Sequence, residues 1–396
     1  MKSRFAAIKI LDLTRYVPGG YATQIYADLG AEVIKVEEIT TGDLCRLDPP
    51  QIQGFSYYFS ALNRNKKSLS LNLKSEQGQQ IFRRLAEEAD VIIENFRPGV
   101  AKRLNIDYPV IKELNPKIIY CSLSGFGQEN PDSLKGYHDI NFLALSGFMA
   151  LNTDTGSQLP PVFFADMAAS MFAALGISLA LLDRKTTGEG QNLDVSFFKS
   201  FQTWLRLMFS RFHFQGNQIK PEDKQFLGDT ICYNVYKTKD NRFMTLGIVE
   251  PKFWQDFCEL TGAEDLIPKQ WVLRQNDPEA WGKICSIFAS KTQQEWIKWL
   301  EDKDVCMTPV KNLEEATQDN LVENQGIIDY VNYPEIGQTL QIGFPLKLSG
   351  ISTSLQETTP PPALGRDTVE ILQKIGFNQN EIKELIRSGI ARTSFS

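Results

Sequence analysis

Alternating strand and helix signals in the first third of the chain limit its fold more than any other feature. Two apolar, β-rich runs are separated by a turn and a helical segment that a glycine ends: Ala7–Leu13, Pro18-Gly19-Gly20, Tyr21–Leu29, Gly30 and Ala31–Val36. A strand–helix–strand unit this compact joins parallel strands through a right-handed crossover. Similar signals continue at Ser68–Leu73, Glu76–Ala89, 91–93, Lys117–Leu123 and Asn192–Phe198. We therefore expect a Rossmann-like parallel α/β sheet in residues 1–199.

A change of composition after residue 200 predicts a second, smaller lobe. A single core rarely grows beyond about 250–300 residues, so a chain of 396 residues is expected to divide. Two short strands around Asp240-Asn241 form a hairpin pattern within Cys232–Val249, and helical stretches follow it at Lys252–Leu260, Pro278–Ser290 and Gln293–Leu300. We predict a linker at 200–228, an α+β lobe at 229–312, and a return linker with C-terminal helices at 313–396.

Charge and composition exclude several classes of protein. With 42 Lys and Arg against 48 Asp and Glu, the net charge of −6 argues against nucleic-acid binding. Charged residues interrupt every apolar run of the N-terminus, so we expect no secretory signal. We predict that Met167–Leu182, which is shorter than the roughly 20 residues of a membrane span, is a buried helix. The six cysteines form no CxxC pair, which predicts a cytoplasmic protein with reduced thiols and no metal site.

The predicted sheet lacks the glycine fingerprint of dinucleotide-binding proteins. Its first turn contains TRYVPGG in place of GxGxxG, and no Walker sequence occurs, so we expect neither NAD nor FAD. Basic segments at Asn63–Lys67 and Asn95–Gly99 instead flank strands. Because ligands of open α/β sheets bind beyond the carboxyl ends of the strands, Arg97 and Phe96 are candidates to hold a phosphate and a purine ring. The alternative for both segments is a solvated loop.

Three side chains are candidates for acid–base chemistry, and each also has a structural explanation. His138 is one of two histidines and precedes an apolar helix at Phe142–Leu151; the other, His213, is expected to be structural. Asp166 opens a helix rich in small residues, where a capping role alone would explain it. Glu250 precedes Pro251 at another predicted helix start.

Several motifs in the same order resemble the class III CoA-transferase family, of the CaiB–BaiF type. They are DLTRYVPGGYATQIYADLGAEVIKVE, NRNKKSLSLNL, ENFRPG, SLSGFGQ, FFADMAASMFAALGISLALLDRKTTGEGQ, CMTPV and PPPALGRDT, and they extend over nearly the whole chain. The resemblance implies a large Rossmann-like lobe, a small lobe and a C-terminus that returns to the large lobe. It also implies an interlocked, ring-like homodimer.

The resemblance further implies that coenzyme A lies on the large lobe as part of a thioester substrate, with no permanently bound cofactor. The positions that match the family's motifs as coenzyme A contacts are Arg64, Lys66, Lys67, Asn95, Phe96, Arg97, Arg103 and Lys135. One departure concerns the nucleotide contacts, because many members have an arginine where this chain has Glu38.

Members of the family perform one of two reactions on acyl-CoA. In the transferases, the residue that matches Asp166 attacks the thioester and forms an acyl-aspartyl anhydride. In the α-methylacyl-CoA racemases, the same aspartate acts with a histidine that a glutamate supports, in motifs that match 136–142 and 247–253 here. The resemblance therefore favours a racemase that inverts the α-carbon by two-base proton transfer between His138 and Asp166, with Glu250 holding the imidazole.

Two further features bear on this choice. The backbone N–H of Asp139, at a helix start, is our candidate donor to the enolate oxygen. Met167-Ala168-Ala169-Ser170 after Asp166 departs from the racemase pattern and has a texture also common among transferases. The segment 227–233 replaces the string that usually precedes the hairpin, so the acyl group is expected to differ from a standard 2-methylacyl chain. The CoA-transferase reaction at Asp166 is therefore the alternative, and a divergent protein that only binds coenzyme A is a third possibility.

Overall fold

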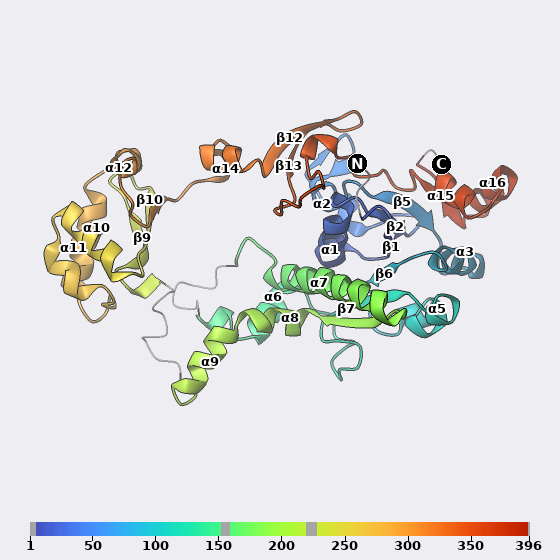
Figure 1. Ribbon diagram of the computed structural model, residues 1–396, viewed down its shortest axis with the longest axis horizontal. Helices are drawn as coiled ribbons and strands as arrows, with labels where there is room; N and C mark the ends of the chain where they lie inside the picture. Colours follow the sequence, from blue (N-terminus) through green and yellow to red (C-terminus); the bar gives the residue numbers. More distant parts are fainter. Residues whose placement is uncertain (1–4, 152–158, 219–227, 395–396) are drawn as a thin grey trace. The chain divides into compact units, whose positions relative to one another are not determined.

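The computed structural model describes residues 5–151, 159–218 and 228–394, coloured along the sequence in Figure 1. The described residues divide into two compact units. The first contains residues 5–148, 159–204 and 323–394, and the second contains 149–151, 205–218 and 228–322.

A seven-stranded sheet forms the centre of the first unit. Its strands are β1 (Lys9–Asp12), β2 (Glu32–Glu37), β5 (Lys67–Leu71), β6 (Val91–Glu94), β7 (Ile119–Ser124), β8 (Asn192–Ser196) and β14 (Ala391–Arg392). They lie in the order β14-β5-β2-β1-β6-β7-β8, and all neighbours pair in parallel except β14, which is antiparallel to β5. The six parallel strands have the order of a Rossmann sheet. The predicted parallel α/β sheet is confirmed.

Helices cover both faces of this sheet because adjacent strand residues point to opposite sides. In β1, Leu11 packs into a core with α3 (Glu76–Ala86), α5 (Tyr108–Leu114), α15 (Thr368–Lys374) and α16 (Gln379–Arg387). Ile10 packs on the other face with α1 (Tyr16–Asp28) and α7 (Phe164–Thr187). In Figure 1 the C-terminal helices α15 and α16 lie beside β5, far from it in sequence.

Three helix starts differ from the sequence prediction. Helix α1 begins at Tyr16, so Pro18-Gly19-Gly20 lies inside its first turns instead of forming a separate turn. This is possible because proline is tolerated in the first turn of a helix, where its missing N–H would have no partner. Helix α6 (Asp139–Leu145) begins three residues before the predicted Phe142.

Helix α7 has 24 residues, against the 16 residues predicted at Met167–Leu182. By length and composition it is the one helix of the described residues that meets the requirements of a membrane span. Its buried positions are mostly alanine and serine, including Ala169, Ala173 and Ala180. These small side chains allow close packing against α1 and the sheet, so one face of α7 is part of the core.

The second unit contains a three-stranded antiparallel sheet. Its strands are β9 (Tyr233–Lys237), β10 (Phe243–Gly247) and β11 (Met307–Pro309), in the order β11-β10-β9. Strands β9 and β10 form the predicted hairpin. The helices α10 (Pro251–Thr261), α11 (Pro278–Ala289) and α12 (Gln293–Leu300) are close to their predicted bounds. Together they enclose an aromatic core that contains Trp254, Phe288 and Trp296.

Other elements were not predicted. A hairpin of β12 (Ile328–Tyr333) and β13 (Gly337–Ile342) lies in the predicted return linker, and part of the linker predicted at 200–228 is helical. The remaining elements are η1 (Leu44–Leu47), β3 (Gln51–Ile52), β4 (Phe55–Ser56), α2 (Tyr57–Leu62), α4 (Val100–Arg103), α8 (Phe197–Trp204), α9 (Arg206–Phe214), η5 (Glu264–Lys269), α13 (Leu313–Thr317), α14 (Asn320–Gln325) and η6 (Leu355–Glu357).

Candidate active site

A pocket of about 460 Å³ lies at the carboxyl ends of four neighbouring strands of the large sheet. Its lining comes from the residues that follow β1 (13–15), end β2 and follow it (36–38), end β5 and follow it (71–74), and follow β6 (Phe96). The strand order reverses between β1 and β6, which is where open α/β sheets bind their ligands. This position makes the pocket the principal candidate for a ligand site in the first unit.

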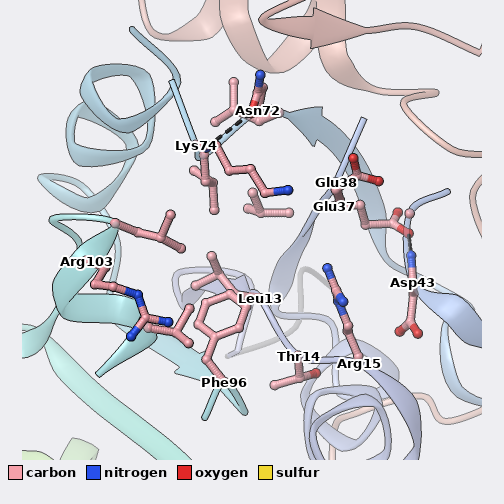
Figure 2. Close-up of a pocket in the computed structure, with 16 residues that line it drawn as sticks. Leu13, Thr14, Arg15, Glu37, Glu38, Asp43, Asn72, Lys74, Phe96 and Arg103 are labelled. Carbon is pink, nitrogen blue, oxygen red and sulfur yellow. Dashed lines mark hydrogen bonds between the residues drawn. The ribbon is translucent and has the colours of Figure 1, made fainter. Parts of the chain in front are cut away.

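Three cationic side chains line this pocket: Arg15 follows β1, Lys74 follows β5, and Arg103 ends α4, the short helix after β6. Figure 2 shows Arg15, Lys74 and Arg103 on separate sides of the cavity, with the rings and methyl groups of Phe96 and Leu13 between them. An arrangement of separated cations around an apolar floor suits a ligand that carries both phosphates and a flat ring. Of the three, the sequence had singled out only Arg103, although residues after predicted strands are where ligand contacts are expected.

The loop after β6 holds Asn95, Phe96 and Arg97 in different surroundings. The Asn95 amide brackets the main chain of Arg15, accepting from its N–H at 2.9 Å and donating to its carbonyl at 2.8 Å. Phe96 lines the pocket. Arg97 is exposed and lies against Gly136, where an added Cβ would come 2.9 Å from the Arg97 Nη2. The loop therefore connects the pocket with the segment that leads to His138.

Acidic residues at the end of β2 are mostly engaged within the protein. Buried Glu37 forms two hydrogen bonds with the Arg46 guanidinium, at 2.7 Å each. Burial alone would raise the pKa of Glu37, but the pairing with Arg46 lowers it. Glu38 lines the pocket, and its Oε2 accepts from the N–H groups of Thr40 and Thr41 at 2.9 and 3.0 Å. Its carboxylate is therefore fixed in place beside the cationic residues.

Besides Asn95 and Arg97, four predicted coenzyme A contacts lie outside the lining of this pocket. The guanidinium of Arg64 is buried against Asp28, and Lys67 pairs with Glu32 and Glu370 at 2.9 Å each. Lys135 is exposed and pairs with Asp132.

The fourth, Lys66, is fully enclosed. Its ammonium donates to Thr23 Oγ1 at 2.7 Å, to Asn63 Oδ1 at 2.9 Å and to the Gly20 carbonyl at 3.0 Å, and it lies 3.3 Å from the Asp12 carboxylate. An ammonium has three N–H donors, so these partners satisfy it. A contact between Lys66 and coenzyme A stays a prediction from the resemblance.

A second group of polar residues lies where α6 and α7 begin. Asp139, the first residue of α6, is buried, and its Oδ1 accepts from the N–H groups of Ala165 and Asp166 at 2.7 and 3.2 Å. These N–H groups belong to the first turn of α7, whose N-cap residue, Phe163, provides no side-chain acceptor. The cap of α7 is thus Asp139, not Asp166 as the sequence indicated.

The Asp166 side chain is therefore not used as a cap, and its surroundings disfavour its charge. Burial, and then the charge of Asp139, raise the pKa of Asp166 to about 7. The pKa of Asp139 is also raised by burial, although the N–H groups of Asp166 and Ala165 act in the opposite direction. A carboxyl group with a pKa near 7 exchanges protons readily at neutral pH, which suits acid–base chemistry.

His138 directly precedes this pair, whereas Glu250 lies in the second unit. His138 is the exposed N-cap residue of α6, and its N–H donates to Asn141 Oδ1 at 2.9 Å. Glu250 is the exposed N-cap residue of α10, which confirms its predicted location at a helix start. Its side chain makes no capping bond. The structure brings together the His138–Asp139 segment and Asp166.

Tyr58, on α2, was not among the predicted site residues, yet it lies close enough to Asp166 for the two side chains to interact electrostatically. Burial, and then the charge of Asp166, raise the pKa of Tyr58 well above its usual range. The Tyr58 ring is 6.1 Å from that of Tyr16 and 5.8 Å from that of Tyr57. Tyr16 has a positive φ of 61°, a strained conformation for a non-glycine residue that often marks functional sites. This unusual backbone has no sequence signal.

The fold and the site together define an α/β protein with a Rossmann strand order, a cationic pocket at the strand ends and a pair of aspartates, of which Asp139 is buried and Asp166 half-buried. Comparison with known proteins assigns it further. The chain belongs to CoA-transferase family III, which it matches over residues 5–368.

Similar proteins with described activities include members of two reaction classes. The alpha-methylacyl-CoA racemase of Mus musculus is 33% identical over 384 residues, covering 96% of this chain and 95% of that protein. The succinyl-CoA:glutarate CoA-transferase of Mus musculus is 31% identical over 392 residues, covering 97% and 89%. The protein is therefore an enzyme of the family III CoA-transferase/racemase group.

Solved structures share the fold. A CaiB/BaiF family protein from Brucella suis has a TM-score of 0.81 with 24% identity, over 95% of this chain and 100% of that one. A hypothetical protein from Mycobacterium tuberculosis has a TM-score of 0.79 with 26% identity, over 92% and 97%.

Proposed function

We propose that this protein is a racemase or epimerase of 2-methylacyl-CoA thioesters, which moves a proton at the α-carbon between His138 and Asp166. The observation that carries the proposal is the hydrogen bonding of Asp139 to the first turn of α7. It fastens the segment that bears His138 to the helix that bears Asp166. The similarity to the mouse racemase over nearly the whole chain supports it.

In this proposal the nucleotide part of coenzyme A occupies the pocket at the strand ends. The guanidinium of Arg103 and the ammonium of Lys74 would bind phosphate oxygens, and the ring of Phe96 would pack against the adenine. Arg97 lies against Gly136 and would contact the part of the ligand that extends from the pocket toward His138. The acidic side of the pocket at Glu38 would face a hydroxyl group rather than a phosphate.

Inversion of the α-carbon requires that one group remove the proton and another return one. For one enantiomer the Asp166 carboxylate takes the α-proton, the electron pair moves onto the thioester oxygen as an enolate, and the His138 imidazolium returns a proton to the carbon. For the other enantiomer the roles reverse. The pKa of about 7 suits Asp166 to both roles. The N–H of Asp139, at the start of α6, has no acceptor among the described residues and would donate to the enolate oxygen.

Support of the His138 imidazole by Glu250 is the remaining part of the racemase proposal, and it follows from the resemblance. The test compares Glu250→Gln with the native protein. The variant should exchange the α-proton more slowly but bind coenzyme A with unchanged affinity. An unaltered exchange rate would remove Glu250 from the mechanism.

The proposal is tested by proton exchange with defined variants. The protein is incubated with one enantiomer of a 2-methylacyl-CoA in D₂O without an acceptor acid, and α-deuteration and the enantiomer ratio are followed. We expect deuteration and racemisation to be lost in His138→Ala and in Asp166→Ala. His213→Ala is the matched control, because this second histidine lies on α9 and has no part in the proposal. Loss of activity in the control, or retention in His138→Ala, would contradict the assignment.

The CoA-transferase reaction is the second candidate, and the state of Asp166 favours it. Its carboxyl group is not used to cap α7, so it is available as a nucleophile. In this reaction a carboxylate oxygen attacks the thioester carbonyl and expels the coenzyme A thiolate, which leaves a mixed anhydride. The similarity to the mouse succinyl-CoA:glutarate CoA-transferase supports it. A hydroxylamine-sensitive acyl-enzyme that forms without His138 would establish it.

We further propose that the enzyme acts as a homodimer in the cytoplasm, without membrane attachment. One face of α7 carries an exposed apolar stripe at helical spacing, formed by Met171, Leu175, Leu179 and Leu182, whose exposures are 48, 53, 56 and 63%. Such a stripe is unfavourable in water. A second copy of the chain, as the resemblance implies, would cover it.

A further inference from the structure

The two aspartates at the start of α6 and α7 form a coupled pair with unequal surroundings. Asp139 Oδ1 receives two backbone N–H groups, from Ala165 at 2.7 Å and from Asp166 at 3.2 Å. The carboxyl group of Asp166 has no such donor among the described residues, and Ser170 bonds only to its main-chain carbonyl. Hydrogen bonds from N–H groups stabilise a carboxylate and not a protonated carboxyl. When the two carboxyl groups share one proton, it is therefore favoured on Asp166 and the negative charge on Asp139.

The helix beneath the pair strengthens this preference. The first N–H groups of α7 have no partner within the helix and carry the positive end of its dipole. Asp139 occupies these donors from outside the helix, although Asp166 itself lies in the first turn of α7. The N–H groups at the helix start therefore stabilise the negative charge of Asp139. Asp166 instead lies next to that negative charge, which disfavours its own ionisation.

We propose that Asp139 is a positioning residue that holds a proton on Asp166 in the resting enzyme up to about neutral pH, by occupying the N-terminal donors of α7 and facing Asp166 with its own charge. The pair then shares one proton, which resides on Asp166. The catalytic meaning of this assignment depends on the proposed function, in which Asp166 is the acid–base or nucleophilic group. The role belongs to the Asp139 side chain and is separate from any role of its backbone N–H.

Other groups around Asp166 do not provide this effect. Among the described residues, Asp139 on α6 is the one charged group that acts on the pKa of Asp166, after burial. Tyr58 on α2 responds to the charge of Asp166, and its own raised pKa keeps it neutral. The α1 residues that contact α7 include Tyr26, whose hydroxyl is bonded to the Ala174 carbonyl further along the helix. Removal of the Asp139 charge should therefore lower the pH at which Asp166 loses its proton, while burial continues to favour the protonated form.

The experiment measures the protonation of Asp166 directly, without substrate. Infrared spectra are recorded against pH on the full-length protein labelled with ¹³C-aspartate, and the band of the protonated Asp166 carboxyl is assigned by its loss in Asp166→Asn. In the native protein we expect this band to disappear with a midpoint at about 7. In Asp139→Asn, which retains an acceptor oxygen but no charge, the midpoint should fall by about 1 unit or more.

Two variants separate this effect from a loss of the helix cap. Asp139→Ser also retains a capping oxygen without charge, and it should lower the midpoint as Asp139→Asn does. Asp277→Asn is the matched control, because Asp277 also caps a helix through a backbone N–H, as the N-cap residue of α11 bonded to Ala280, and is remote from Asp166 in the sequence. The control should leave the Asp166 midpoint unchanged. A native midpoint near the usual value of an aspartate, or an unchanged midpoint in both Asp139 variants, would overturn the proposal.

A kinetic measurement distinguishes this inference from the proposed function. The acidic limb of the pH profile of kcat/KM should move to lower pH in Asp139→Asn, by a shift similar to that of the infrared midpoint. This direction holds for both candidate reactions, because each requires the loss of a first proton from the fully protonated site. If the infrared midpoint shifts but neither reaction occurs, the proposed function fails and the proton assignment stands. If either reaction occurs but neither the acidic limb nor the infrared midpoint moves, the proposed function stands and the proton assignment fails.

Discussion

The carboxyl groups of Asp12 and Glu94 show that neighbouring charges, more than burial, decide the ionisation of residues at the strand ends. Both are buried at the last position of a strand, in β1 and β6. Burial raises the pKa of each, but Lys35 and Lys66 beside Asp12 lower its pKa well below the usual range. Glu94 has no such cation, and burial raises its pKa to about 7. The two residues therefore make opposite contributions to stability at neutral pH.

Glu94→Gln should stabilise the protein at alkaline pH and have little effect near pH 5. Between about pH 4.5 and 7 the folded protein binds the Glu94 proton more tightly than the unfolded chain, so native stability falls as the pH rises through this window. The full effect above pH 7 is on the order of 3 kcal/mol as an upper limit, and glutamine retains the acceptor for the Phe96 N–H. Urea unfolding at pH 5 and pH 8 measures it. An equal difference at both pH values would rule out this origin.

Lys66 and Arg103, both predicted to contact coenzyme A, should respond differently to substitution. Lys66→Met leaves Asp12 buried without its closer cation and should lower the free energy of unfolding by about 3 kcal/mol. The Arg103 guanidinium is exposed and has no hydrogen bond or ion pair among the described residues, so Arg103→Ala should leave stability unchanged but weaken coenzyme A binding by roughly 10-fold or more. Thermal melting and calorimetric titration of each folded variant provide the comparison. Equal effects of both substitutions on binding would show that Lys66 reaches the ligand.

At the level of elements, helix α1 is positioned by a close approach to the strand-end loop that lines the pocket. An added Cβ at Gly19 would lie 2.1 Å from Thr14 Cγ2, and Thr14 is held by its bond to Asp12 Oδ1 at 2.5 Å. At Gly20, one residue further along the helix, the nearest atom would be Leu62 Cβ at 3.4 Å. A side chain at position 19 would therefore collide with Thr14, whereas position 20 has room for a methyl group.

Gly19→Ala should destabilise the protein by about 1–3 kcal/mol and weaken coenzyme A binding, because the new methyl group displaces Thr14 and the pocket-lining Arg15. Gly20→Ala should be neutral or stabilising by up to about 1 kcal/mol, since alanine favours the helix. Denaturant unfolding and ligand titration of the two variants are compared directly. Equal destabilisation would mean that the space around Gly19 adapts.

Most elements were predictable from the sequence, and those that were not depend on contacts distant in the chain. The parallel strands and the helices of the second unit have strong local patterns, as at Val91–Glu94 and Gln293–Leu300. Strand β14 has two residues and exists because it pairs with β5, more than 300 positions earlier. The β12–β13 hairpin turns at 334–336, where Ile336 is buried, and its strands alternate exposed and buried residues only weakly.

The whole molecule contains separate cores, and each unit has its own sheet and helices. The predicted catalytic residues are divided between the units: His138, Asp139 and Asp166 belong to the first unit, and Glu250 belongs to the second. Sequence motifs identified these residues individually. They did not show that Asp139 caps α7, because that bond joins residues 26 and 27 positions apart.

The exposed apolar stripe of α7 leads to a prediction about assembly. Light scattering after gel filtration should give a mass near twice 44.8 kDa for the native protein, because burial of the stripe removes apolar surface from water. The double variant Leu175→Glu and Leu179→Glu should lower the proportion of dimer. A native protein of single-chain mass would contradict the proposed homodimer, and an unaffected dimer in the variant would place the interface elsewhere.

The central claim is that the enzyme inverts the α-carbon and leaves the thioester bond intact. The most direct test offers both reactions at once: one enantiomer of a 2-methylacyl-CoA and a free carboxylic acid are incubated with the enzyme in D₂O. Mass spectrometry and chiral analysis then follow the α-hydrogen and the position of coenzyme A. We expect α-deuterium in both enantiomers of the original thioester. Transfer of coenzyme A to the acid, with the α-hydrogen and its configuration retained, would exclude the racemase and establish the CoA-transferase.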